Sequence, residues 1–157
     1  MLLGAGGAAR AAAVQCLNAG CQSLWIGNRS LERLRALLKS FKDPIYAERL
    51  KSFSLARLPV GLPRTGVLIN ATTLGLKPND PSPIDLSAFD PSLKVYDMIY
   101  QPPQTSLLRM ARQYGMASAN GLSMLVHQGA RALSIWTQTK APVDVMHEAA
   151  FCSLKEG

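Results

Sequence analysis

The chain has 157 residues, 48% hydrophobic and 17% charged, which suits one well-buried globular domain and excludes a disordered chain. Its net charge of +7 is scattered rather than interleaved with aromatic side chains, so we expect no nucleic-acid partner. Because no run approaches the roughly 18 apolar residues of a spanning helix, and the N-terminus lacks the basic region of a signal peptide, we expect a cytoplasmic protein with no membrane partner.

The first motif begins at the fourth residue, where Gly4, Gly6 and Ala9 fit the dinucleotide fingerprint G-x-G-x-x-G/A. Gly4 would make the tight turn, Gly6 would let the backbone approach a pyrophosphate, and the following helix would direct free N–H groups at it. A buried strand normally runs roughly four to eight residues, and only residues 1–3 precede this turn. We therefore expect a truncated first strand in one domain of a larger protein.

The rest of the chain alternates helix and strand patterns. The first half predicts a helix over 8–19 ended by Gly20, a strand over 22–27, a helix over 31–41 capped by Ser30, a short strand at 45–46, and a loop over 47–66 with one helical turn near 54–58. The second half predicts strands at 66–70 and 94–98 around a proline-rich loop over 75–91, a helix over 106–114 capped by Thr105 and ended by Gly115, an edge strand at 116–119, and helices over 121–139 and from Pro142 to about 154.

This alternation predicts an α/β fold in one domain over 1–157. We expect a Rossmann-like, doubly wound, mostly parallel sheet with helices on both faces.

The end of the second strand indicates which dinucleotide the domain prefers. NAD sites of this kind usually carry an Asp or Glu there to accept from the ribose 2′-OH, but this chain continues as Asn28-Arg29-Ser30, with Arg33 one helical turn later. Arginine side chains at this place can bind a 2′-phosphate with paired charged hydrogen bonds. The sequence therefore favours NADP over NAD, against the plainer interpretation that both arginines are solvated surface.

Neither a metal site nor a disulfide framework is predicted. Cys16, Cys21 and Cys152 are an odd number and lack C-x-x-C spacing, so we interpret them as free thiols. His127 and His147 are interpreted as ordinary surface or packing residues, and Asp97 as a structural hydrogen-bonding residue.

Five segments in chain order closely resemble the C-terminal half of shikimate dehydrogenases. They are residues 4–8, 28–33, 70–75, 96–102 and 120–130, and the resemblance extends from residue 2 to about 150. The resemblance implies reduction of 3-dehydroshikimate to shikimate with NADPH, in chorismate and aromatic amino-acid biosynthesis.

The resemblance also implies roles for single residues. Gly4, Ala5, Gly6, Gly7 and Ala8 would hold the pyrophosphate, Asn28, Arg29, Ser30 and Arg33 the adenosine 2′-phosphate end, Thr72, Met98 and Gly121 the nicotinamide, and Tyr100 and Gln128 the substrate. The alternatives are that Tyr100 packs at a strand end and that Gln128 faces solvent.

The family places the Lys and Asp assigned to proton transfer in an N-terminal substrate domain, so no catalytic residue is predicted here. We expect this chain to bind NADPH, to be nearly inactive alone, and to expose apolar surface around Tyr100 and the last two helices, favouring self-association. Two alternatives stay open: a quinate/shikimate relative that uses NAD, and a non-catalytic dinucleotide-binding module.

Overall fold

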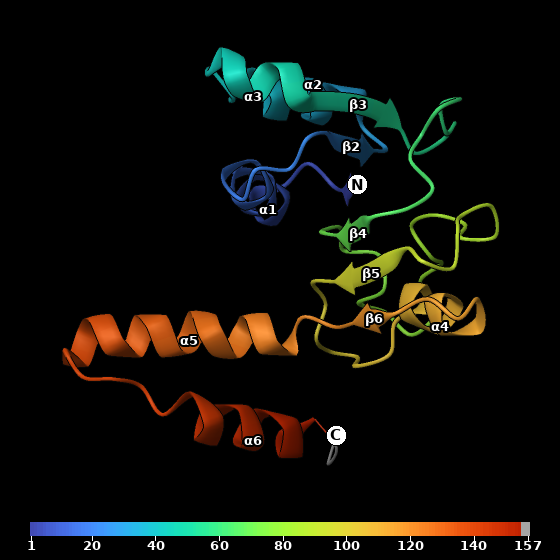
Figure 1. The fold of residues 1–157 in the computed structure, drawn as a ribbon. Helices are drawn as coiled ribbons and strands as arrows, with labels where there is room; N and C mark the ends of the chain where they lie inside the picture. The colour runs from blue at the N-terminus through green and yellow to red at the C-terminus, as the bar shows by residue number, and fades with distance from the viewer. Residues whose placement is uncertain (155–157) are drawn as a thin grey trace.

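The computed structural model describes residues 1–154, and its core is one six-stranded sheet (Figure 1). The strands are β1 (Leu2–Leu3), β2 (Leu24–Asn28), β3 (Leu50–Ser54), β4 (Val67–Asn70), β5 (Lys94–Asp97) and β6 (Ser118–Ala119). Their order across the sheet is β3-β2-β1-β4-β5-β6, and every neighbouring pair is parallel. This is the doubly wound order, in which the chain reverses direction across the sheet beside β1. The predicted fold class is confirmed.

Helices cover both faces of the sheet. The helices within residues 1–154 are α1 (Gly7–Asn18), α2 (Leu31–Lys39), α3 (Pro44–Arg49), α4 (Ser106–Gln113), α5 (Leu122–Thr137) and α6 (Val143–Ser153). In Figure 1, α1 lies on one side of the sheet and α4 on the other. The strand β1 shows how the layers are joined, because successive strand residues point to opposite faces. Leu2 packs in the cluster on the α1 side, whereas Leu3 joins the cluster that includes residues of α4.

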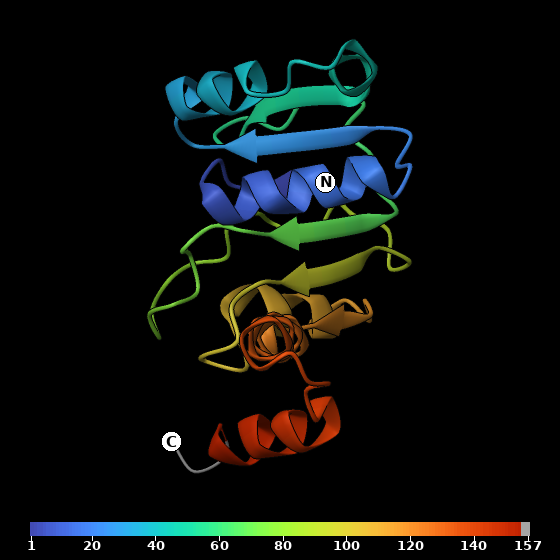
Figure 2. The same ribbon diagram turned by 90° about the vertical axis from the view of Figure 1, so that its left-hand side faces the viewer.

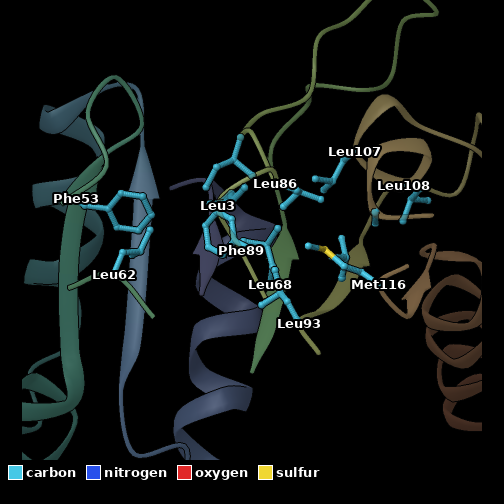
Figure 3. Close-up of a cluster of buried hydrophobic side chains, with 13 residues drawn as sticks. Leu3, Phe53, Leu62, Leu68, Leu86, Phe89, Leu93, Leu107, Leu108 and Met116 are labelled. Carbon is cyan, nitrogen blue, oxygen red and sulfur yellow. The ribbon is translucent and has the colours of Figure 1, made fainter. Parts of the chain in front are cut away.

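The larger hydrophobic cluster gathers segments that are distant in the sequence (Figure 3). Leu68 and Leu107 are fully buried in it, and so are Leu86 from the proline-rich loop and Leu93, which directly precedes β5. The loop is therefore part of the folded core, since its residues Ile84, Leu86 and Phe89 are buried in the same cluster as residues of α4.

Helix capping follows the predicted chemistry. The Ser30 hydroxyl accepts from the Arg33 N–H at 3.3 Å, and the Thr105 hydroxyl accepts from the Leu108 N–H at 3.3 Å. Gly20 adopts φ +80° after α1, a left-handed conformation that glycine adopts without steric penalty. These predicted helix ends are confirmed, with shifts of one or two residues.

Two predictions in the region 45–66 are wrong. Residues 45–46 belong to α3, because the Asp43 carboxylate accepts from the Ile45 N–H at 2.9 Å and Pro44 begins the helix. The loop expected over 47–66 instead contains a strand, β3, which pairs with β2 over five residue positions. The turn expected near 54–58 does follow this strand, since the Arg57 N–H donates to the Ser54 carbonyl at 3.2 Å. As an edge strand, β3 buries only Phe53, so its sequence has weak hydrophobic alternation.

The last two helices form a hairpin that projects beyond the sheet edge at β6 (Figures 1 and 2). α5 packs against α6, and α6 has no buried residue within Val143–Ser153. Several large apolar side chains are exposed on the hairpin, and Trp136 is 80% exposed. The expected apolar surface on these helices is therefore present. Among the helices of residues 1–154, none is both long and apolar enough to cross a bilayer.

Candidate functional site

The glycine turn after β1 has a backbone that other residues cannot adopt without strain. Gly4 has φ +118°, and its N–H donates to the Gly27 carbonyl at 2.8 Å. A Cβ on Gly4 would lie 2.7 Å from the Ala71 carbonyl oxygen. The turn is thus fixed against both neighbouring strand ends, as the fingerprint predicts for its first glycine.

The two following glycines face open space and begin a helix. A Cβ added to Gly6 or Gly7 would meet no atom within 4 Å. Gly6 is the N-cap of α1, no side chain caps that helix, and its first turn has no acidic residue. The α1 N-terminus therefore presents free N–H groups and the positive end of the helix dipole, a favourable arrangement for a phosphate.

An open groove joins this turn to the end of β2. It has a volume of about 170 Å³, below the roughly 300–1,000 Å³ of a closed ligand pocket. The groove is lined by Gly4, Ala5, Gly6, Asn28, Arg29, Arg33, Leu55, Ala71, Thr72, Thr73 and Leu74. Residues from the ends of four strands, β1, β2, β3 and β4, therefore meet at the carboxyl edge of the sheet.

The two predicted arginines lie in this groove. Arg29 and Arg33 are exposed, and within residues 1–154 neither guanidinium group has an ion-pair or hydrogen-bond partner. Asn28 holds the turn between them, because its amide donates to the Ser30 carbonyl at 2.9 Å. The arrangement leaves two permanent positive charges beside the glycine turn, free to bind an anion.

A buried polar network supports the neighbouring strand ends. The fully buried Asp97 carboxylate accepts from the Asn70 amide at 2.9 Å, from the Ile99 N–H at 3.1 Å and from the Thr105 hydroxyl at 2.6 Å. Burial raises the pKa of Asp97, while these three donors lower it in part. Since every partner donates, the network holds Asp97 as a carboxylate, and the predicted structural role is confirmed.

The same network positions the residues expected near the nicotinamide. The Asn70 side-chain oxygen accepts from the Thr72 N–H at 3.0 Å and the Thr72 hydroxyl at 2.7 Å. The Met98 N–H donates to the Asn70 carbonyl at 3.0 Å. Gly121 lies so close to the Met98 carbonyl that a Cβ there would collide with it. The structure therefore brings Thr72, Met98 and Gly121 to adjoining strand ends.

The two predicted substrate residues do not share a cavity with this groove. Tyr100 follows β5 and is 37% exposed. Gln128 is exposed on α5, where it lines a shallow, mostly apolar groove with His127, Arg131 and Ile135. Leu55 and Ala71, which line the glycine-turn groove, were missed from the sequence, and only their positions after β3 and β4 could have indicated them.

Metal binding has no support in the described part of the chain. No group of three or more His, Cys, Asp or Glu side chains within residues 1–154 could hold a metal ion. Over the same residues, every buried side-chain polar atom has a hydrogen-bond partner.

Comparisons with known proteins agree with the fold. The family described as Shikimate 5'-dehydrogenase C-terminal domain matches residues 121–151. A shikimate dehydrogenase (NADP(+)) from Symbiobacterium thermophilum is 43% identical over 160 residues, which is 99% of this chain and 54% of that protein. The corresponding enzyme from Gloeothece citriformis is 39% identical over 95% of this chain and 53% of its own length.

The chain is a homologue of the C-terminal domain of shikimate dehydrogenases. It spans about half the length of the curated relatives that it matches. Its structure is similar to the Thermus thermophilus shikimate 5-dehydrogenase in complex with NADP(H) and shikimate, with a TM-score of 0.78, 35% identity, and coverage of 98% of this chain and 54% of that one. It is also similar to the quinate dehydrogenase from Corynebacterium glutamicum in complex with NAD, with a TM-score of 0.85, 27% identity, and the same coverage.

Proposed function

We propose that this chain is the NADP(H)-binding domain of a shikimate dehydrogenase, which reduces 3-dehydroshikimate to shikimate. One observation carries the choice of cofactor. Arg29 and Arg33 line the same groove as Gly4 and Gly6, and the sequence at the end of β2 has no carboxylate for a ribose 2′-OH. A 2′-phosphate would complement these two charges, whereas the NAD ribose would leave them unpaired.

The residues present fit a dinucleotide at each of its charged parts. The open backbone of Gly6 and Gly7 and the uncapped start of α1 would bind the pyrophosphate. Ala5 and Ala8 flank Gly6 and Gly7. Asn28 and Ser30 fix the chain segment that follows β2 and carries Arg29 and Arg33, through the hydrogen bonds Asn28 amide to Ser30 carbonyl and Arg33 N–H to Ser30 hydroxyl. Thr72, Met98 and Gly121 would adjoin the nicotinamide, because the Asn70 network fixes the strand ends that carry them.

The reaction needs a hydride, which bound NADPH would supply, and a proton for the developing alkoxide. Asp97 is a poor proton donor, since both of its oxygens accept hydrogen bonds inside the fold. Tyr100 and Gln128 could orient substrate hydroxyl or carboxylate oxygens without adding charge. This chain would therefore hold and orient the cofactor, and we propose that it is nearly inactive without a substrate domain.

A second candidate is a quinate or shikimate relative that uses NAD. The structural similarity to the NAD complex of a quinate dehydrogenase favours it. The unpaired guanidinium groups of Arg29 and Arg33 favour NADP instead. A non-catalytic dinucleotide-binding module is the remaining alternative.

Calorimetric titration of the chain with NADP⁺ and then NAD⁺ tests the proposal. We expect NADP⁺ to bind at least about tenfold more tightly, the ratio that ~1.4 kcal/mol of phosphate binding gives. With NADPH and 3-dehydroshikimate, the chain alone should give negligible turnover, and a separately produced substrate domain should restore part of it. Equal affinities would favour the NAD relative, and no restored activity would favour the non-catalytic module.

Self-association and the cytoplasmic location remain predictions. The exposed apolar residues of α5 and α6, including Ile135 and Trp136, support association of the chain. Sedimentation at high concentration tests this, since a clean monomer would contradict it.

A further inference from the structure

The C-terminal end of α1 places two cysteines on opposite sides of one tight turn. The Gly20 N–H donates to the Leu17 carbonyl at 3.0 Å, and the Cys21 N–H donates to the Cys16 carbonyl at 3.1 Å. With Gly20 at φ +80°, this pair of hydrogen bonds is the Schellman motif. In that motif the residue directly after the glycine commonly contacts the residue four positions before the glycine. Here these two residues are Cys21 and Cys16, on either side of Gly20.

The surroundings of the two thiols support the same contact. Both side chains are free, partly buried, and packed against the hydrophobic cluster on the α1 side of the sheet. Burial raises the pKa of the Cys16 thiol, and the nearby Cys21 raises it further. The third cysteine, Cys152, is exposed on α6 and does not belong to this cluster.

We propose that Cys16 and Cys21 are a redox pair, in which a disulfide closes the Schellman turn at the end of α1. Disulfides need Cα atoms about 4.4–6.8 Å apart, and the hydrogen bond from Cys21 to the Cys16 carbonyl brings the two backbones together across the turn. The four residues between Cys16 and Cys21 do not hold the two cysteines apart, because the chain reverses its direction at Gly20.

The oxidant is a small disulfide such as oxidised glutathione. A thiolate of the pair attacks one sulfur of the oxidant, forms a mixed disulfide and releases one glutathione thiolate. The second cysteine, as its thiolate, attacks the protein sulfur of the mixed disulfide and releases the other glutathione thiolate. The two cysteine sulfurs are oxidised, the glutathione disulfide is reduced to two thiols, and two protons leave the protein.

The pair is separate from the dinucleotide groove. α1 is 12 residues long, and at about 1.5 Å per residue its two ends lie roughly 18 Å apart. The glycine turn is at the other end. The inference therefore does not depend on the proposed function, and the thiol measurements need no cofactor.

Equilibration of the whole 157-residue chain in glutathione redox buffers, followed by alkylation and tryptic digestion, tests the proposal. Trypsin cuts after Arg10 and Arg29, so both cysteines fall in the single peptide 11–29. We expect this peptide to lose its two thiol hydrogens and to resist alkylation. The equilibrium constant for the bond should be about tenfold larger in the native chain than in the chain unfolded in urea.

Three variants sharpen the result. Cys152→Ser should leave the equilibrium unchanged, whereas Cys21→Ser should accumulate a mixed glutathione disulfide on Cys16. Gly20→Ala strains the positive-φ turn and should lower the native advantage. If the native chain keeps free thiols or mixed disulfides at both positions, in buffers where the unfolded chain forms the bond, the proposal is overturned.

Discussion

Replacing Thr105 by valine should remove two hydrogen bonds from the buried network while nearly keeping the side-chain shape. The hydroxyl donates to the Asp97 carboxylate at 2.6 Å and accepts from the Leu108 N–H at 3.3 Å. A hydrogen bond to a charged group contributes about 1.5–3 kcal/mol, and an N-cap contributes about 1 kcal/mol. We therefore expect Thr105→Val to lower the free energy of unfolding by roughly 2–4 kcal/mol near neutral pH.

The pH dependence of this loss identifies its cause. Burial raises the pKa of Asp97, and the Thr105 hydroxyl partly opposes that effect, so the variant should raise this pKa further. A carboxyl group whose pKa is raised by folding contributes stability below its unfolded pKa and loses that contribution as pH rises through the folded pKa. The deficit of Thr105→Val should thus be largest at neutral pH and smaller near pH 4.

Urea unfolding at both pH values measures the deficit. Thr105→Ser is the matched control, since it keeps the hydroxyl and removes one buried methyl group worth about 0.8 kcal/mol. Its deficit should not change with pH. A Thr105→Val deficit that is the same at both pH values would refute the assignment of the loss to the Asp97 carboxylate.

Glycine substitutions supply the remaining stability predictions. Gly4→Ala should lower the free energy of unfolding, measured in urea, by roughly 1–3 kcal/mol. The reason is that φ at this position is +118° and the new Cβ would meet the Ala71 carbonyl oxygen. Stability equal to that of the wild type would contradict the turn geometry. Gly121→Ala should destabilise the chain at least as much, because the Cβ would collide with the Met98 carbonyl. Gly129→Ala is its control on α5 and should change thermal stability little; an equal loss in both variants would show that the Met98 contact is not the cause.

The sequence predicted well wherever one local rule decides the structure. Ser30 and Thr105 cap helices because their hydroxyl groups can reach backbone N–H groups three residues later. Gly4 turns the chain because the strand–glycine–helix pattern requires it. In both cases the partners are close in sequence.

Features that depend on distant partners were missed or only partly predicted. β3 forms because β2 offers five paired positions to a segment that buries only Phe53. Leu55 lines the groove because it follows β3, which lies beside β2 in the sheet. Ala71 lines it because it follows β4, which lies beside β1. Likewise, the position of Asp97 at a strand end predicts a structural role, but it does not identify the donors Asn70 and Thr105, which come from other elements.

Cofactor preference in a paired arginine variant is the most direct test of the proposed function. For Arg29→Ala combined with Arg33→Ala, we expect the affinity for NADPH to fall roughly 10- to 100-fold, and the affinity for NADH to stay within about twofold. Arg35→Ala, an exposed position on α2 outside the groove, is the matched control and should leave both affinities unchanged. An unaltered ratio of NADPH to NADH affinity in the double variant would contradict the account.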